Sequence, residues 1–341
     1  MTETQWELLK RTIKGEQSAY LPTGFIVDCP WLPNWYGVTI LDYFSNDAIW
    51  LGANLKAIRD FPDVMFLPGF WSEYGMCTEP SAFGARCSFP ANEFPHAHKI
   101  IHSVSDVDSL PSPNPRIDGL LPMMLNRLKL AQPRIEDAGH KIRFAVARGP
   151  LNIASYLMGT SEFLTLLMMD PAKAETLIRK ITTFLKEWLS LQRETFPSID
   201  GIFLLDDIIG FLGEAEFCTF GLPYFKELYS ADVSVKFLHN DAGCRMSAPF
   251  LPEMGINLFN MGFEITLSEL KSLTGNKVTL VGNIPPRDVL ANGTPGDVAK
   301  ATTDLINSLS DKSRIVLSCG GGMPPGVKSE NIEAFLKAVT R

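Results

Sequence analysis

The sequence lacks an excess of basic residues and any long uninterrupted apolar run. Its 31 Lys and Arg residues are outnumbered by 38 Asp and Glu residues, and the net charge of −7 counts against general nucleic-acid binding. Residues 1–10 contain acidic side chains and no apolar run, so we expect no targeting peptide and a cytoplasmic protein. Polar residues and Gly159 interrupt the most apolar stretch, residues 151–169, which predicts a buried helix and no membrane span.

Closely spaced cysteine pairs are also absent. The six cysteines are Cys29, Cys77, Cys87, Cys218, Cys244 and Cys319, and no two of them form a CxxC motif. In a reducing compartment this distribution indicates buried thiols or metal ligands rather than a disulfide framework. A glycine fingerprint after the first predicted strands is missing too, which leaves little support for the alternative fold, an open doubly wound sheet.

Short apolar runs alternate with longer helical patterns in the C-terminal two-thirds of the chain, which indicates βα units. Strands are predicted at residues 25–28, 64–67, 141–147, 199–205, 233–239, 256–261, 278–282 and 315–319, and one of the predicted helices spans residues 214–229. Eight strands predict a single-domain α/β protein over residues 1–341, a (β/α)₈ TIM barrel with an N-terminal extension. We expect residues 1–60 to contribute to the barrel mouth and residues 80–115 to form a surface excursion.

Polar side chains follow six of these strands at the point where each strand ends. Because active sites of parallel barrels lie at the C-terminal ends of the strands, these side chains predict one pocket. They are Arg148, the pair Asp206 and Asp207, the group His239, Asn240 and Asp241, then Asn260 with Glu264, Asn283, and finally Cys319 before three glycines.

Several of these residues allow two interpretations. His239 and Asp241 can present imidazole and carboxylate to one metal or substrate, and a core histidine bonded to its turn is the alternative. Cys319 with His239 is a favoured donor set for Zn²⁺, whereas a lone Cys319 is more typical of a buried thiol. One acid of the Asp206–Asp207 pair can face the pocket while its neighbour caps a helix.

Four longer motifs resemble the uroporphyrinogen decarboxylase superfamily. They are FLLDDIIG from residue 203, LHNDAG from residue 238, LVGNIPP from residue 280 and CGGGMPPGVKSENI from residue 319. The resemblance runs from about residue 148 to residue 341, and TEPSAFGAR at residues 78–86 is similar to a segment of the methyltransferase members. It implies a (β/α)₈ barrel, and the superfamily includes porphyrinogen decarboxylases and zinc-dependent methyltransferases that work with corrinoid proteins.

The two branches differ in whether an N-terminal segment binds the carboxylates of a substrate. In the decarboxylases this segment has two arginines that bind the carboxylates of the tetrapyrrole, but residues 21–57 here contain no arginine. Burying carboxylates without cations or hydrogen-bond donors costs many kcal/mol. The resemblance is therefore closer to the methyltransferase branch.

The methyltransferase resemblance also implies roles for individual residues. His239, Asp241 in place of a family cysteine, Glu264 and Cys319 are the implied Zn²⁺ ligands. The other candidates are Arg148, Asp206 and Asp207 as catalytic residues, and Glu79, Asn283 and Trp35 as substrate-binding residues. A core position is the alternative for Trp35.

The leading hypothesis is a zinc-dependent methyltransferase that moves a methyl group between a small ether, amine or thiol and a corrinoid protein. Zinc would polarise a leaving group or a bound thiol, and the cobalt of methylcobalamin or a related corrinoid would carry the methyl group. One alternative is a decarboxylase-like lyase with Arg148 as carboxylate clamp and Asp206 or Asp207 as proton donor. Another is a non-catalytic protein that binds a tetrapyrrole or corrinoid. The resemblance to the decarboxylase branch also implies a possible homodimer.

Overall fold

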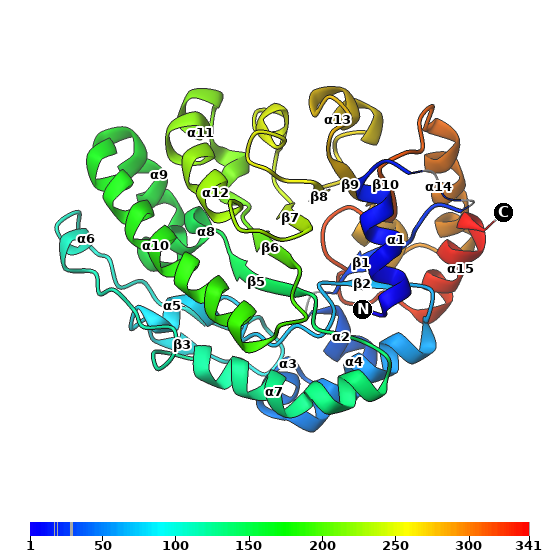
Figure 1. Cartoon of the computed structure of the whole chain (residues 1–341), viewed down its shortest axis with the longest axis horizontal. Coiled ribbons are helices and arrows are strands. Elements are labelled where there is room, and N and C mark those ends of the chain that lie inside the picture. Colours follow the sequence, from blue (N-terminus) through cyan, green and yellow to red (C-terminus); the bar gives the residue numbers. More distant parts are fainter. Residues whose placement is uncertain (17, 19, 28–29, 341) are drawn as a thin grey trace.

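Eight parallel strands form the centre of the molecule, and helices surround them (Figure 1). The structure is a computed structural model that describes residues 1–16, 18, 20–27 and 30–340. The strands are β1 (Gly24–Ile26), β2 (Met65–Leu67), β5 (Phe144–Arg148), β6 (Gly201–Leu205), β7 (Val235–Asn240), β8 (Leu258–Met261), β9 (Thr279–Ile284) and β10 (Ile315–Cys319). They coincide with the eight predicted strands, except that Asp28, the end of the first prediction, and the adjacent Cys29 lie outside the described residues.

The strand order is that of a TIM barrel. Strands β5 to β10 form one parallel sheet in sequence order, β1 pairs with β2, and bridges from Thr23 to Leu317 and from Ile26 to Gly322 join β1 to β10. Among the described residues β2 and β5 share no paired backbone, but their inward side chains belong to one cluster. The predicted (β/α)₈ architecture is therefore confirmed, with inward side chains packed together where β2 lies next to β5.

The helices that follow the strands form the outer layer. They are α2 (Trp31–Tyr36), α3 (Ile40–Ser45), α4 (Asp47–Asp60), α5 (Thr78–Ala82), α6 (Asp106–Ser109), α7 (Leu121–Asp137), α8 (Pro150–Met158), α9 (Thr160–Met169), α10 (Pro171–Thr195), α11 (Glu214–Phe220), α12 (Leu222–Leu228), α13 (Leu267–Leu273), α14 (Pro295–Ser308) and α15 (Ser329–Val339). Within the described ranges, none of the helices has both the length and the apolar character that crossing a membrane requires.

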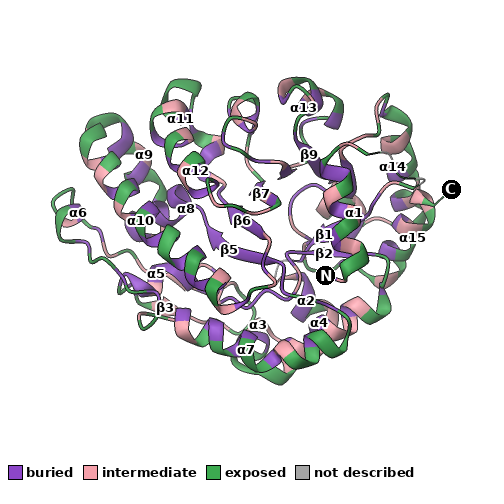
Figure 2. Cartoon of the chain, viewed as in Figure 1, coloured by how far each residue is buried: buried purple, intermediate pink, exposed green. Residues whose placement is uncertain are grey.

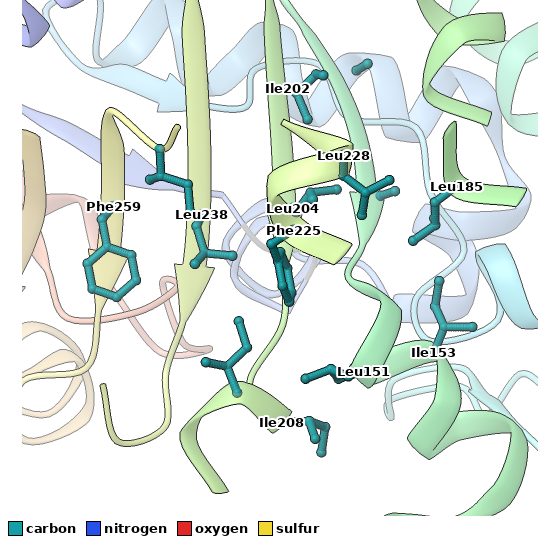
Figure 3. Packing of buried hydrophobic residues seen from close by; sticks show 14 of the residues in the cluster. Leu151, Ile153, Leu185, Ile202, Leu204, Ile208, Phe225, Leu228, Leu238 and Phe259 are labelled. Atoms are coloured by element: carbon teal, nitrogen blue, oxygen red, sulfur yellow. The ribbon is translucent and has the colours of Figure 1, made fainter. Parts of the chain in front are cut away.

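Two hydrophobic layers hold the barrel together, because successive side chains of a strand point to opposite faces. On the outer face, Ile202, Leu204 and Leu238 pack against side chains of α8, α10 and α12 (Figure 3). The strands are buried on both faces, whereas the helices expose one side to solvent (Figure 2). The inner cluster includes Phe144, Val146, Phe203, Leu205, Val235, Phe237, Leu258, Val281 and Val316.

Helix α1 (Glu3–Ile13) covers the N-terminal ends of the strands. Its Trp6 and Leu9 belong to the inner cluster, and the Trp6 indole N–H donates to Asp200, directly before β6, at 3.4 Å. The Thr279 hydroxyl at the start of β9 donates to the Thr12 carbonyl at 3.4 Å. The buried face of α1 therefore fills the end of the barrel opposite to the mouth, and a contribution of the rest of residues 1–60 to the mouth stays a prediction.

The long excursion between β2 and β5 contains a small hairpin. Strand β3 (Cys87–Ser88) pairs antiparallel with β4 (His96–Ala97). This hairpin follows α5, which carries Glu79 toward the barrel.

Candidate active site

Strand alternation decides which polar residues face the barrel interior at its C-terminal end. Phe144 and Val146 point inward, so Arg148 at the end of β5 does as well. The register pairs Arg148 with Leu205, Leu205 with His239, and His239 with Asn260. Arg148, His239 and Asn260 therefore share one level of the interior, near the mouth.

His239 is held in a defined orientation by Asn260. The imidazole is 4% exposed, and its Nδ1 lies 2.7 Å from the Asn260 Oδ1. The amide nitrogen of Asn260 donates to the Val281 carbonyl at 2.7 Å, so its oxygen is the atom that accepts from Nδ1–H. In the neutral ring this leaves the lone pair on Nε2.

Asp241 lies beside this lone pair. Its Oδ2 is 3.6 Å from His239 Nε2, and its side chain is about half exposed. Partial loss of hydration raises the pKa of Asp241 and Asp207 adds to this shift, while His239 and Arg287 oppose it. A Cβ on Gly321 would approach Asp241 Oδ1 to 2.1 Å, so only glycine fits there while Asp241 keeps this position.

The predicted zinc ligands are only partly brought together. In a tetrahedral zinc site with bond lengths of about 2.0 to 2.2 Å, two ligand atoms lie about 3.3 to 3.5 Å apart. His239 Nε2 and Asp241 Oδ2 are 3.6 Å apart, so they fit two of the four ligand positions. Glu264 is exposed on the loop after β8, and the Cys319 thiol donates to the Gly321 carbonyl at 3.7 Å. The part of the chain that the structure describes holds no group of three such side chains arranged for a metal ion. Since catalytic zinc sites use three protein ligands, the described residues do not complete one.

Arg148 is the centre of a buried charge cluster. Its guanidinium donates to Glu73 Oε2 at 2.8 Å and lies 3.6 Å from Glu79 Oε2, while Glu79 Oε1 accepts from the Arg148 backbone N–H. All three residues are at most 5% exposed. Burial alone would lower the pKa of Arg148, but the two carboxylates raise it well above its usual value, and burial raises the pKa of Glu79. Arg148 is thus already paired with two acids of the chain itself.

The two adjacent aspartates have different environments. Asp206 is fully buried and accepts from the backbone N–H groups of Leu151 and Asn152, at 2.9 and 3.1 Å, in the first turn of α8. A third N–H, from Ile208, bonds its other oxygen at 3.2 Å, and burial raises the pKa of Asp206 to about 8. Asp207 faces the mouth and accepts from the Asp241 backbone N–H at 2.7 Å. Asp206 therefore anchors a helix, and Asp207 is the acid of this pair that belongs to the mouth.

The two remaining predicted substrate residues have structural contacts. The Asn283 amide donates to the Ile265 carbonyl at 2.6 Å and so fixes the loop after β8. The Trp35 indole donates to Ser329 at 3.0 Å and stacks on Trp31, between α2 and α15. Trp35 is therefore placed outside the barrel interior, as the alternative core interpretation expected.

Sequence reasoning missed Glu73 and Tyr156 at the mouth, and it assigned no role to Asn260. Glu73 lies in an irregular segment without any local motif, and only its contact with Arg148 identifies it. Asn260 was visible as a strand end, but its role depends on the register with His239. Tyr156, on α8, has its pKa raised to about 12 by burial, with Arg148 opposing the shift.

Comparison with known families and structures places this site in context. The family model "Uroporphyrinogen decarboxylase (URO-D)" matches residues 34–341. This chain belongs to the uroporphyrinogen decarboxylase family. A uroporphyrinogen decarboxylase of Coxiella burnetii is 24% identical over 302 residues, covering 84% of this chain and 80% of that protein. One from Pseudomonas fluorescens is 24% identical over 274 residues, covering 77% and 75%.

Solved structures show the same fold. A methyltransferase from Methanosarcina mazei matches with a TM-score of 0.80 and 18% identity over 97% of both chains. A B12-independent methionine synthase from Shewanella matches with a TM-score of 0.57 and 12% identity, over 94% of this chain and 96% of that one. The superfamily expected from the sequence motifs is confirmed.

Proposed function

We propose that this family member is a methyltransferase that moves a methyl group between a small substrate and a corrinoid protein. The observation that carries the proposal is the charge of the mouth. Glu73, Glu79, Asp207 and Asp241 surround it, and Arg148 is already paired with the first two of these acids. This arrangement favours neutral or cationic substrates over carboxylates.

A porphyrinogen with eight carboxylates conflicts with this electrostatic environment. Residues 21–57 supply no arginine, and carboxylates brought beside Asp207 and Asp241 would meet like charges at short range. The same argument opposes a lyase that uses Arg148 as a carboxylate clamp, because a substrate would have to displace Glu73. The fold similarity to the Methanosarcina mazei methyltransferase supports the same choice.

The proposed chemistry for this chain is proton transfer at the reacting atom. A corrinoid supplies the cobalt that carries the methyl group. His239, with its lone pair on Nε2, accepts the proton of an X–H methyl acceptor, and Asp241 stabilises the resulting imidazolium. Asn260 keeps the ring in this tautomer. Zinc at His239, Asp241, Glu264 and Cys319 stays a prediction, and no step is assigned to it.

Exposed apolar side chains at the mouth support a protein partner. Phe211, Met246 and Phe263 are 62%, 52% and 48% exposed. They lie on the segments that follow β6, β7 and β8, at the same end of the barrel as His239. Large exposed apolar groups are typical of binding surfaces, and we assign this rim to the corrinoid protein.

The test is a methyl-transfer assay with methylcob(III)alamin and a panel of neutral, cationic and anionic acceptors, followed by the absorbance of the cobalamin. We expect transfer to neutral or cationic acceptors, and a loss of about 10²-fold or more in His239→Gln. His102→Gln, at an exposed loop position, is the matched control and should keep full activity. Transfer that is unaffected by His239→Gln, or that is confined to anionic acceptors, would contradict the proposal.

Zinc binding is tested separately by equilibrium dialysis. If Asp241 is a ligand, Asp241→Ala should lower zinc occupancy and Asp241→Cys should retain it, because thiolate is the softer donor. Equal zinc affinity in wild type and Asp241→Ala would remove Asp241 from the ligand set.

A further inference from the structure

Two histidines lie side by side on the β3–β4 hairpin. His96 begins β4 and His98 follows this strand directly, where its backbone N–H donates to the Arg86 carbonyl at 2.8 Å and so continues the pairing with β3. Because side chains alternate along a strand, both imidazoles lie on one face of the hairpin. Both residues are half-buried, and their ring centroids are 5.5 Å apart with the ring planes at 56°.

This separation suits two ligands of one metal ion. At metal–nitrogen distances of about 2.0 to 2.1 Å and nitrogen–metal–nitrogen angles of about 90 to 110°, the centroids of two imidazoles on one ion lie about 4.5 to 5.2 Å apart. The observed distance is slightly longer, and a small rotation of either side chain closes the difference. None of the described residues forms a hydrogen bond with the His96 ring, so both of its nitrogens are available for a ligand.

Ser88 sets the orientation of the second ring. Its hydroxyl oxygen lies 2.7 Å from His98 Nε2, and Ser88 is paired with His96 in the hairpin register. When the hydroxyl accepts from Nε2–H, the lone pair of the neutral ring is on Nδ1. Histidines that bind metal ions typically donate their other ring N–H to a neighbouring group in this way. Nδ1 is therefore the ligand atom of His98.

Arg86 acts on the same nitrogen in the opposite direction. Its Nη2 lies 3.4 Å from His98 Nε2, and a guanidinium can only donate, so this contact favours the tautomer with the lone pair on Nε2. The positive charge also opposes a metal cation, although Arg86 is exposed and water and salt screen it. The two neighbours of Nε2 should thus have opposite effects on metal affinity.

We propose that His96 and His98 bind a divalent transition metal ion of the Ni²⁺ and Zn²⁺ class, with water as the remaining ligands. Imidazole is a common ligand of these ions. Water is required because the part of the chain that the structure describes has no three side chains of the ligand types placed around one ion. The site lies on the excursion between β2 and β5, so it is separate from the zinc ligands predicted at the barrel mouth.

The test is a titration of the full chain, labelled with ¹⁵N-histidine, with Ni²⁺ alone, followed by NMR of the imidazole nitrogens. Paramagnetic Ni²⁺ broadens the signals of the rings that bind it. We expect the signals of His96 and His98 to broaden together, at a lower Ni²⁺ concentration than that of the exposed His102. Broadening of only one ring of the pair, or of His102 at the same concentration, would overturn the proposal without any variant.

Substitutions then test each contact through the Ni²⁺ concentration at half broadening. His96→Gln should weaken binding at His98 by about tenfold or more, because one ligand is lost from a chelating pair. Ser88→Ala should weaken it by about tenfold, since the tautomer is no longer fixed. Arg86→Gln should tighten it, and His102→Gln is the matched control that should leave it unchanged.

Two results with the variants would contradict the proposal. Equal affinity of wild type and His96→Gln would show that His98 binds Ni²⁺ alone. Weaker binding in Arg86→Gln, or unchanged binding in Ser88→Ala, would exclude Nδ1 of His98 as the ligand atom.

Discussion

The two ends of the barrel are built from the same strands but bury different kinds of side chains. At the N-terminal end, Trp6 packs edge-on against Phe144 at 5.3 Å, while the carboxylate of Glu3 remains 56% exposed. At the C-terminal end, Arg148, Glu73 and Glu79 are buried together. Buried ion pairs contribute little to stability relative to apolar packing, so a gain in stability does not by itself account for this cluster. Apolar packing therefore holds the α1 end together, whereas a buried charge cluster lies at the mouth.

The largest expected effect breaks the mouth cluster. Arg148→Met leaves two buried carboxylates without their cation, and we expect a loss of about 3 to 5 kcal/mol in the free energy of unfolding. Urea denaturation at neutral pH measures this loss. Arg116→Met, in the exposed pair with Glu194, is the control and should leave the urea midpoint unchanged. Equal effects of the two substitutions would contradict the proposed contrast.

The second effect is a pH dependence that originates at Asp206. Its pKa rises from 3.8 to about 8 on folding, so the folded state binds this proton more tightly than the unfolded chain. Stability from this group is full below about pH 4 and is lost as the pH rises to about 8, with a slope of up to about 1.4 kcal/mol per pH unit. Asp206→Asn should flatten this slope in urea denaturation between these pH values.

Asp207 sharpens the same test. Its charge contributes to the raised pKa of Asp206, so Asp207→Asn should move the upper limit of the window to lower pH. An unchanged slope in Asp206→Asn would show that another group titrates.

A smaller effect is expected at Asn260. Asn260→Ala leaves the buried Nδ1–H of His239 without this acceptor. The free energy of unfolding should fall by about 1 to 3 kcal/mol, and the imidazole should no longer be held in one tautomer. Nitrogen NMR of the imidazole reads the tautomer directly, and the exposed His102 serves as an internal reference. A His239 signal that matches wild type would rule out this role of Asn260.

The smallest effect is expected at the opposite end. Glu3→Gln removes an exposed carboxylate from Lys141 and Arg143, where water and salt screen the charges. We expect no resolvable change in the urea midpoint and no change in methyl transfer. A large loss of either would mean that the α1 end is not independent of the mouth.

The fold was predictable because its strands are apolar runs with a recognisable spacing. Apolarity did not reveal where helices end: residues 151–169 form α8 and α9, separated at Gly159 with a φ of 104°. The predicted helix at residues 214–229 is likewise divided at Gly221 into α11 and α12. The position of α1 depends on contacts with residues as distant as Arg314, which no local pattern contains.

Site residues at strand ends could be predicted from the sequence. Roles that depend on contacts with residues distant in the sequence could not. Arg148 and His239 were predicted because each lies at the end of a strand, where its side chain points into the barrel. The separate roles of Asp206 and Asp207 depend on the alternation of side chains along β6, because it directs the Asp206 side chain outward to α8. Glu73 reaches Arg148 across 75 residues of sequence, and such a contact is set only by the tertiary structure.

The most direct test of the central claim is turnover of uroporphyrinogen by the purified chain. The acidic mouth and the arginine-free segment at residues 21–57 predict no carbon dioxide release above the background without protein. One of the related uroporphyrinogen decarboxylases, assayed in parallel, establishes that the substrate is intact. Release of carbon dioxide by this chain at a rate comparable to that enzyme would contradict the account.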